Sequence, residues 1–222
     1  MARKLRIAVP DSGDEVSGLI ERPPDADCLL VFAHGAGADM NHAFMEATSQ
    51  RLTALRIATL RYQFPYMEQG RRSPSPRGVL LATVRAAVAE AASQAPDLPL
   101  LAGGKSMGGR MTSLAASEAP LPRVEALVFF GFPLYPAGKP STDRADHLAD
   151  VPLPMLFLQG TRDKLADLEL LERARKPLGS RTTLHIVEGA DHSFHVLKRS
   201  GRSDAEALDE LANTLRHFTD LL

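Results

Sequence analysis

The sequence has little of several residue types, and each shortage narrows what the protein can be. Its 222 residues include no tryptophan and only one cysteine, Cys28. A single cysteine permits no intramolecular disulfide and no cysteine-based metal cluster. Because Cys28 begins the apolar run Cys-Leu-Leu-Val-Phe, we interpret it as a small buried hydrophobic residue.

Long apolar runs and an excess of one charge sign are also missing. No window reaches the length that spans a bilayer, and the first ten residues, MARKLRIAVP, are basic but lack the apolar stretch of a secretory signal. The formal net charge of -1 gives no overall attraction to nucleic acid or to an anionic membrane. We therefore expect a cytoplasmic protein with neither kind of partner. Its oligomeric state stays open.

What is present is an ordinary globular composition, with 44% hydrophobic and 24% charged residues. A chain of this length suits one domain with a substantial core. Two loop-like stretches, 63–77 and 131–150, are rich in proline and glycine, but neither is long enough to be a domain. We expect a single domain over residues 1–222.

Apolar runs alternate with helical patterns along the chain. Strands are expected at 5–9, 16–21, 28–33, 57–60, 98–102, 124–130, 154–158 and 182–187, with a turn at 10–14. Helices are expected at about 42–55, 78–92, 106–118 and 165–176, and after the capping box of Ser203 and Glu206. This alternation predicts an α/β fold with a mostly parallel central sheet, in which sites form at the carboxyl ends of the strands.

A glycine-rich stretch follows the expected strand at 98–102. Residues 104–108 read Gly-Lys-Ser-Met-Gly and match the pattern G-x-S-x-G between a strand and a helix. This context is typical of a nucleophile elbow, in which Ser106 takes a strained backbone angle and small neighbours let the two elements approach. The alternative is a glycine-rich turn that holds phosphate. The phosphate-loop pattern G-x-x-x-x-G-K-[ST] is not met, because position 99 is Pro99.

A serine nucleophile needs a histidine base, which in this kind of fold follows the serine in the chain. His192 is the predicted base, because its small-residue loop lies directly after the strand at 182–187 and can bring the imidazole over the sheet edge. His195, three residues later, is the alternative, or a residue that supports the turn. His217 lies within the final helix, where we expect an exposed or packing role.

The base in turn needs a carboxylate to hold its Nδ1–H. Asp163 is the predicted acid, because it follows the strand at 154–158 and precedes a helix. Asp167 is a weaker candidate, since a carboxylate in the first turn of a helix is favourable in itself. Asp191 adjoins the predicted base and is expected to cap or brace its turn.

Two backbone N–H groups are needed to stabilise an oxyanion. We expect one from Met107, the residue after the nucleophile, and one from Ala36, in the sequence His-Gly-Ala-Gly-Ala at 34–38. Small residues in that loop let the backbone come close to a substrate. His34 is expected to order the loop by a hydrogen bond, with a direct catalytic role as the alternative.

With these motifs in place, the chain resembles an α/β-hydrolase over essentially its whole length. Within that superfamily it is similar to small, lidless dienelactone-hydrolase-like hydrolases, which share their domain with an animal testis-expressed protein and a chromatin-complex subunit. The stretches HGAG, GKSMGGR and GADHSF carry the match. The resemblance implies a three-layer fold with about eight strands, the second antiparallel, helices on both faces and no large lid. It also implies that Ser106, Asp163 and His192 form a triad.

The resemblance leaves the substrate open, because dienelactone hydrolases proper use a cysteine nucleophile where this chain has Ser106. We hypothesise a serine hydrolase that acts on small carboxylic esters through an acyl-enzyme, without metal or organic cofactor. Thioesterase, peptidase and acyltransferase are variants that the residues do not separate. The alternative from another class is a binding or scaffold module that keeps the fold without turnover.

The expected pocket walls come from the loops at 61–77 and 132–150. Basic residues there could bind an acidic substrate group, or they could simply be solvated. The residues predicted to line the substrate pocket are His34, Gly35, Arg61, Tyr62, Lys105 and Tyr135.

Overall fold

Residues 2–10 and 12–222, which the computed structural model describes, contain eight strands in one sheet. Their order across the sheet is β1-β2-β4-β3-β5-β6-β7-β8. The strands are β1 (Ala2–Ala8), β2 (Glu15–Glu21), β3 (Cys28–Ala33), β4 (Ile57–Tyr62), β5 (Leu100–Lys105), β6 (Val124–Phe130), β7 (Met155–Gly160) and β8 (Thr182–Val187). β2 runs antiparallel to β1 and β4, and the remaining neighbours are parallel. The expected α/β fold and its antiparallel second strand are confirmed.

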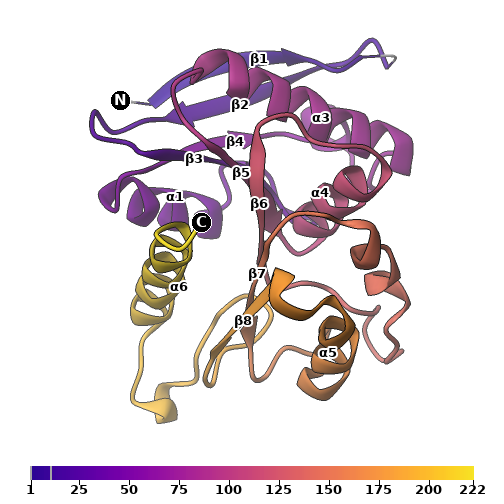
Figure 1. Ribbon diagram of the computed structural model, residues 1–222, viewed down its shortest axis with the longest axis vertical. Coiled ribbons are helices and arrows are strands. Elements are labelled where there is room, and N and C mark those ends of the chain that lie inside the picture. The colour runs from indigo at the N-terminus through magenta and orange to yellow at the C-terminus, as the bar shows by residue number, and fades with distance from the viewer. Residues whose placement is uncertain (1, 11) are drawn as a thin grey trace.

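The middle of the sheet is buried on both faces, because a layer of helices covers each side. Every residue of β3, β4 and β7 is buried. Leu29 and Val31 of β3 point into one apolar cluster, which α3 (Arg77–Gln94) and α4 (Met107–Glu118) help to build. Leu30 and Phe32 point into the other, built with α1 (Ala43–Ala54) and α6 (Asp204–Thr219). Figure 1 shows α1 and α6 on one side of the sheet, and α3, α4 and α5 (Leu168–Arg175) on the other.

The strand order places the ends of β3 and β5 side by side. The chain leaves β3 for β4 on one side, and β5 then pairs with β3 on the other. The six parallel strands, β3 to β8, all end at one edge of the sheet, so the loops that follow them meet there. A switch point of this kind is where open α/β sheets form their sites.

Two segments that the sequence predicts as loops contain short helices. These are α2 (Pro65–Glu68) and the 3-10 helix η1 (Asp143–Asp150). Both are too short to show a repeating apolar stripe, which is the signal on which helix prediction depends. Two further short 3-10 helices are η2 (Lys176–Arg181) and η3 (Lys198–Ser200). The turn expected at 10–14 includes Asp11, which lies outside the described residues.

β5 runs to Lys105, beyond the expected end at residue 102, because two glycines continue it. A Cβ added at Gly103 would lie 1.9 Å from the carbonyl oxygen of Val128 on β6. Only glycine therefore fits at that position of the pairing. Because glycine is depleted in strands generally, the sequence predicts that this strand ends before Gly103, which is too early.

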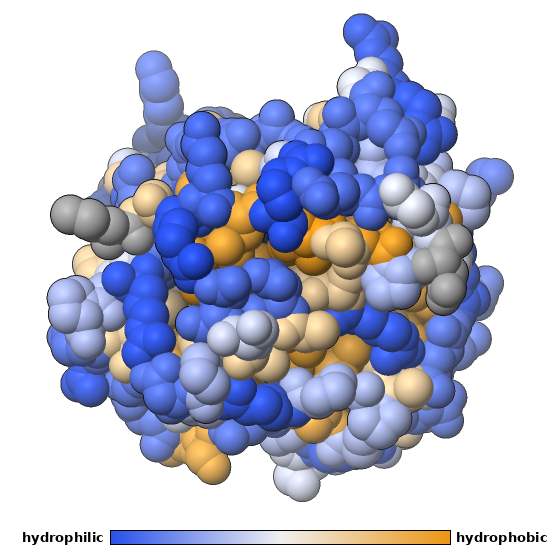
Figure 2. All heavy atoms as spheres, turned by 90° about the horizontal axis from the view of Figure 1, so that it is seen from above, coloured by the Kyte–Doolittle hydropathy of each residue, from blue (hydrophilic) through white to orange (hydrophobic). Residues whose placement is uncertain are grey.

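The final helix begins as the sequence predicts. The Ser203 side chain accepts a hydrogen bond from the Glu206 N–H, and the Glu206 carboxylate accepts one from the Ser203 N–H. Seen from the β1 end, the molecular surface is mostly hydrophilic, with apolar side chains between the polar ones (Figure 2). Among the helices of the described residues, none is both long and apolar enough to cross a membrane.

Candidate active site

Ser106 lies on the sharp turn between β5 and α4. Its backbone angles are φ 51° and ψ -115°, a left-handed conformation that non-glycine residues rarely adopt. The strained backbone expected for this serine is therefore present. Strain at a single polar residue on a strand-to-helix turn is typical of functional positions.

The glycines around Ser106 are required by close approach to β3. A Cβ at Gly104 would lie 2.4 Å from the carbonyl oxygen of Ala33. A Cβ at Gly108 would lie 2.6 Å from the carbonyl oxygens of both Ala33 and His34. The turn and the first turn of α4 thus pack directly on the end of β3, which places Ser106 beside the loop that follows β3.

Three side chains from the ends of different strands meet at this edge. His192 Nε2 lies 2.8 Å from Ser106 Oγ, and His192 Nδ1 lies 2.7 Å from Asp163 Oδ2. A carboxylate oxygen accepts only, so Nδ1 carries the proton in this pair. Nε2 is then free to accept the hydroxyl proton of Ser106. The geometry is that of a nucleophile, a base and a carboxylate that orients the base.

Asp163 is held from several sides after the end of β7. Its side chain is fully buried. Leu165 N–H donates to Oδ1 at 2.8 Å, and the amide of Gln159 donates to Oδ2 at 2.5 Å. Gln159 is itself fixed, because its Oε1 accepts from the Phe132 N–H at 3.0 Å. Gln159 is not among the residues predicted for the site, although a lone amide near the end of an apolar strand is a signal for such a role.

The loop that carries His192 is braced by its own backbone. Asp191 Oδ1 accepts hydrogen bonds from the N–H groups of Ser193 at 2.8 Å and His195 at 3.1 Å, which confirms the bracing role expected for Asp191. The His195 imidazole pairs with Asp204 at 2.8 Å, at a half-exposed position.

The remaining candidates take structural roles. His217 is exposed on α6. Asp167 caps the amino terminus of α5 by accepting from Leu170 N–H at 3.0 Å, so it is not the partner of His192.

A cavity of about 190 Å³ opens at Ser106. Its lining comes from the loop after β3, the start of α1, the β5 turn and the His192 loop: Gly35, Ala36, Gly37, Ala38, His42, Phe44, Met45, Lys105, Ser106, His192 and Ser193. Met107 is the first residue of α4, so its N–H has no partner within the helix. Ala36 is exposed in the cavity wall. Of the two predicted oxyanion donors, Met107 thus directly follows Ser106 in the chain, and Ala36 lies in the wall of the same cavity.

Four of the six predicted pocket residues, His34, Arg61, Tyr62 and Tyr135, do not line this cavity, so their assignment as pocket residues is corrected. Arg61 on β4 is 3% exposed and pairs with Glu21 of the neighbouring strand β2 at 2.9 Å. Tyr62 is fully buried in the core, and the Tyr135 hydroxyl accepts from Asp167 N–H at 2.7 Å. Strand and loop geometry turns these side chains inward, which composition alone does not indicate.

His34 is a structural residue of the loop after β3, as expected. Its Nε2 accepts from Phe64 N–H at 3.1 Å, and its Nδ1 lies 2.8 Å from the carbonyl oxygen of Gly35. A carbonyl only accepts, so Nδ1 carries the proton. Burial lowers the pKa of His34 to about 4, which keeps this imidazole neutral. Gly35, which follows it, lies against Ser106 in the cavity wall.

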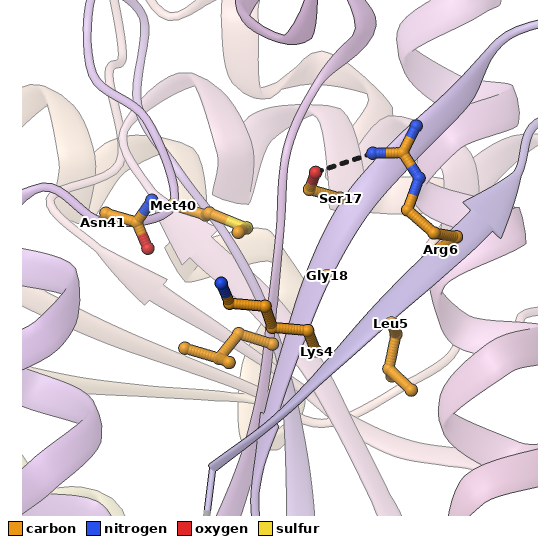
Figure 3. Close-up of a pocket in the computed structure, with 8 residues that line it drawn as sticks. Lys4, Leu5, Arg6, Ser17, Gly18, Met40 and Asn41 are labelled. Atoms are coloured by element: carbon orange, nitrogen blue, oxygen red, sulfur yellow. Dashed lines mark hydrogen bonds between the residues drawn. The ribbon is translucent and has the colours of Figure 1, made fainter.

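A second and larger cavity, about 490 Å³, lies beside β1 and β2 and contains no comparable chemistry (Figure 3). Its lining residues are Lys4, Leu5, Arg6, Ser17, Gly18, Leu19, Met40 and Asn41. Figure 3 shows Arg6 turned toward Ser17, with which it bonds at 2.8 Å, and Arg6 also pairs with Glu68 at 2.7 Å. Ser17 Oγ also donates to Glu68 at 2.9 Å, but that carboxylate is itself paired with Arg6, and no histidine is among the described residues that line this cavity. The smaller cavity is the better candidate site.

Comparison with known proteins agrees with the fold. A family described as "Alpha/beta hydrolase domain" matches residues 26–220. Dienelactone hydrolase from Anabaena variabilis ATCC 29413 is similar at 22% identity, with a TM-score of 0.76 over 98% of this chain and 95% of that one. XC6422 from Xanthomonas campestris, described as a serine hydrolase without lid, is similar at 20% identity, with a TM-score of 0.72 over 97% and 92%. Identities this low show likeness of fold alone.

Two curated relatives carry a different name. They are the putative phosphoribosyl transferases MT0597 and Rv0571c of Mycobacterium tuberculosis, each 30% identical to this chain over 183 residues. The match covers 81% of this chain and 39% of each relative. The chain therefore spans about two fifths of the length of these relatives.

Proposed function

This chain belongs to the alpha/beta hydrolase domain family, and we propose that it is a serine hydrolase that cleaves small carboxylic esters through a Ser106-His192-Asp163 triad. The observation that carries the proposal is the continuous hydrogen-bond chain from the Ser106 hydroxyl through the imidazole to a buried carboxylate. A strained serine, an imidazole and a fully buried carboxylate in this order form the arrangement of a catalytic triad. A scaffold module would have no use for the strain, so the scaffold alternative is less favoured.

The reaction follows from the protonation states. His192 Nε2 takes the hydroxyl proton as Ser106 Oγ bonds to the ester carbonyl carbon, and the carbonyl oxygen becomes an oxyanion. The N–H groups of Met107 and Ala36 donate to that oxygen. The bond to the leaving oxygen then breaks, and Nε2 returns its proton to the departing alcohol. Water, deprotonated by the same nitrogen, attacks the acyl-enzyme, releases the acid and restores Ser106.

The cavity limits the substrate in size and charge. Its volume of about 190 Å³ is below the usual range for drug-sized ligands, and Phe44 and Met45 form apolar walls. Among the basic residues predicted to gather there, only Lys105 lines the cavity, and its ammonium donates to a backbone carbonyl. We therefore propose short, uncharged acyl groups as substrates.

The phosphoribosyl transferase name of the curated relatives is not carried over. The shared segment makes up 39% of each relative, and the activity named there need not reside in that segment. The residues assembled at Ser106 suit acyl transfer.

The proposal is tested by hydrolysis of p-nitrophenyl esters of increasing acyl length. Ser106→Ala should lower kcat/KM by at least about 10³-fold, since a serine nucleophile cannot be replaced by water at that site. Ser113→Ala is a matched control, because Ser113 Oγ also bonds to a histidine, His147 Nε2, at 2.7 Å, but it is buried within α4. The control should retain full activity. Equal activity of Ser106→Ala and the wild type would overturn the proposal.

A further inference from the structure

Lys105 ends β5 directly before Ser106, and its side chain reaches the loop that carries His192. Its Nζ donates a hydrogen bond to the backbone carbonyl oxygen of His192 at 2.6 Å. The ammonium also lies 5.8 Å from the ring centroid of Phe44 and 5.5 Å from that of Phe194. These two rings stack on each other, with centroids 5.8 Å apart. The Lys105 side chain thus connects the turn that carries Ser106 to the loop that carries His192, and its ammonium lies over the two aromatic rings.

The ammonium is also a close neighbour of the imidazole–carboxylate pair. Gly131, at φ 70°, lies where the three groups converge. A Cβ at this glycine would lie 3.1 Å from Lys105 Nζ, 3.4 Å from His192 Nδ1 and 3.5 Å from Asp163 Oδ2. The cation, the protonated ring nitrogen and the carboxylate therefore surround the same small volume. No side chain separates them at Gly131.

We propose that Lys105 is a positioning residue for His192: its ammonium fixes the backbone of the base loop, and its charge opposes protonation of the imidazole. The inference rests on the proposed role of His192 as base. A carboxylate beside an imidazole favours the charged imidazolium, which cannot accept a proton from the serine. A cation at the same place counters this effect and keeps the base in its neutral form.

The charge of Lys105 is present at neutral pH. Burial lowers the pKa of Lys105 to about 8, and the carboxylates of Asp163 and Asp191 partly offset the effect of burial. At pH 7 the side chain is thus mostly an ammonium. The titratable and charged groups around the His192 imidazole are Asp163 after β7, Lys105 on β5, Asp191 on its own loop and His42 across the cavity.

The experiment compares the pH profile of kcat/KM for p-nitrophenyl acetate in the wild type and in Lys105→Met, which keeps the length of the side chain without donor or charge. We expect a fall of about tenfold at the optimum, and a shift of the acid limb to higher pH by roughly one unit, the size expected of a unit charge a few ångströms away. Lys105→Gln, which restores a neutral donor, should lose less activity but show the same shift. Lys164→Met is the matched control, because Lys164 adjoins Asp163 in sequence but is exposed, and it should change neither quantity.

Chemical rescue separates a charge effect from damage to the fold. In Lys105→Cys, alkylation with 2-bromoethylamine rebuilds an ammonium at nearly the original position, and the native Cys28 is only 6% exposed and so protected. The alkylated protein should recover the wild-type acid limb. An acid limb that stays at its wild-type position in Lys105→Met, whatever the loss in rate, would overturn the proposal.

Failure of the proposed function is detected separately. The imidazole titration of His192, followed by NMR in the absence of substrate, should move to higher pH in Lys105→Met even if no ester is turned over. An inactive wild type with this shift present would refute the hydrolase proposal alone. A titration that does not move would refute the role of Lys105 alone.

Discussion

Replacement of Asp163 by asparagine tests how the acid acts on the base. Asp163 accepts hydrogen bonds from three donors: Leu165 N–H at Oδ1, and both Gln159 Nε2 and His192 Nδ1 at Oδ2. An asparagine offers one acceptor oxygen and one donor NH₂ group. If its oxygen keeps the Leu165 bond, its NH₂ faces two other donors. Gln159 cannot turn its amide to accept without losing the bond from Phe132 N–H.

The adaptable partner is therefore His192. Its neutral ring can move the proton to Nε2, so that Nδ1 accepts from the new NH₂ group. Nε2 then carries a proton and cannot accept the one from Ser106. The expected loss in kcat is about 10³- to 10⁴-fold, or about 4–5.5 kcal/mol of transition-state stabilisation, as for the same change in a well-characterised serine protease triad.

The assay is kcat for p-nitrophenyl acetate at pH 7, with circular dichroism to verify folding. Asp167→Asn is the matched control, because Asp167 caps α5 through one bond to Leu170 N–H and asparagine is an equally good cap. Its activity should stay within about twofold of the wild type, since an equivalent cap leaves the fold in place. Full activity in Asp163→Asn would refute the tautomer argument and with it the role of Asp163.

Two further predictions concern the support of the site. Gly108→Ala should destabilise the fold by about 2–3 kcal/mol in urea unfolding and reduce kcat at least about tenfold, because the new Cβ would lie 2.6 Å from the carbonyl oxygens of Ala33 and His34. Gly78→Ala in α3, whose new Cβ would meet nothing within 4 Å, should be neutral or stabilising by up to about 1 kcal/mol. Burial lowers the pKa of His34 from 6.5 to about 4, so the unfolded chain binds more protons between these values and the folded state loses about 3 kcal/mol as pH falls through that window. In His34→Gln the unfolding free energy should fall less between pH 7 and pH 4, and an unchanged slope would contradict the assignment.

Much of the sheet is predictable because its strands are bounded by clear signals. The limits expected for the strands at 28–33, 124–130 and 182–187 agree with β3, β6 and β8 to the residue. All three begin after a turn or loop and consist largely of apolar or β-branched residues. By contrast, β5 extends through two glycines that tertiary packing requires and propensity disfavours. Here the neighbouring strand, rather than the local sequence, determines where β5 ends.

The three reactive residues of the candidate site can be predicted from their order in the chain and their places after strands. Most of the residues that line the cavity cannot. Ser106, Asp163 and His192 each follow an apolar strand, and parallel topology brings such positions to one edge. The orientation of a loop side chain has no comparable rule. Tyr62 and Arg61 end β4 and turn into the protein, while Phe44 and Met45 of α1 line the cavity instead. The sequence indicates that the small-residue loop at 34–38 approaches the serine, but it gives no sign that the start of α1 completes the cavity wall.

Labelling by a fluorophosphonate tests the central claim most directly, because this reagent phosphonylates a serine only when a base activates it. Intact-mass analysis of the native protein should show one adduct, peptide mapping should locate it at Ser106, and the His192→Ala variant should label far more slowly. Absence of an adduct on the native folded protein, or an adduct on a different serine, would contradict the account.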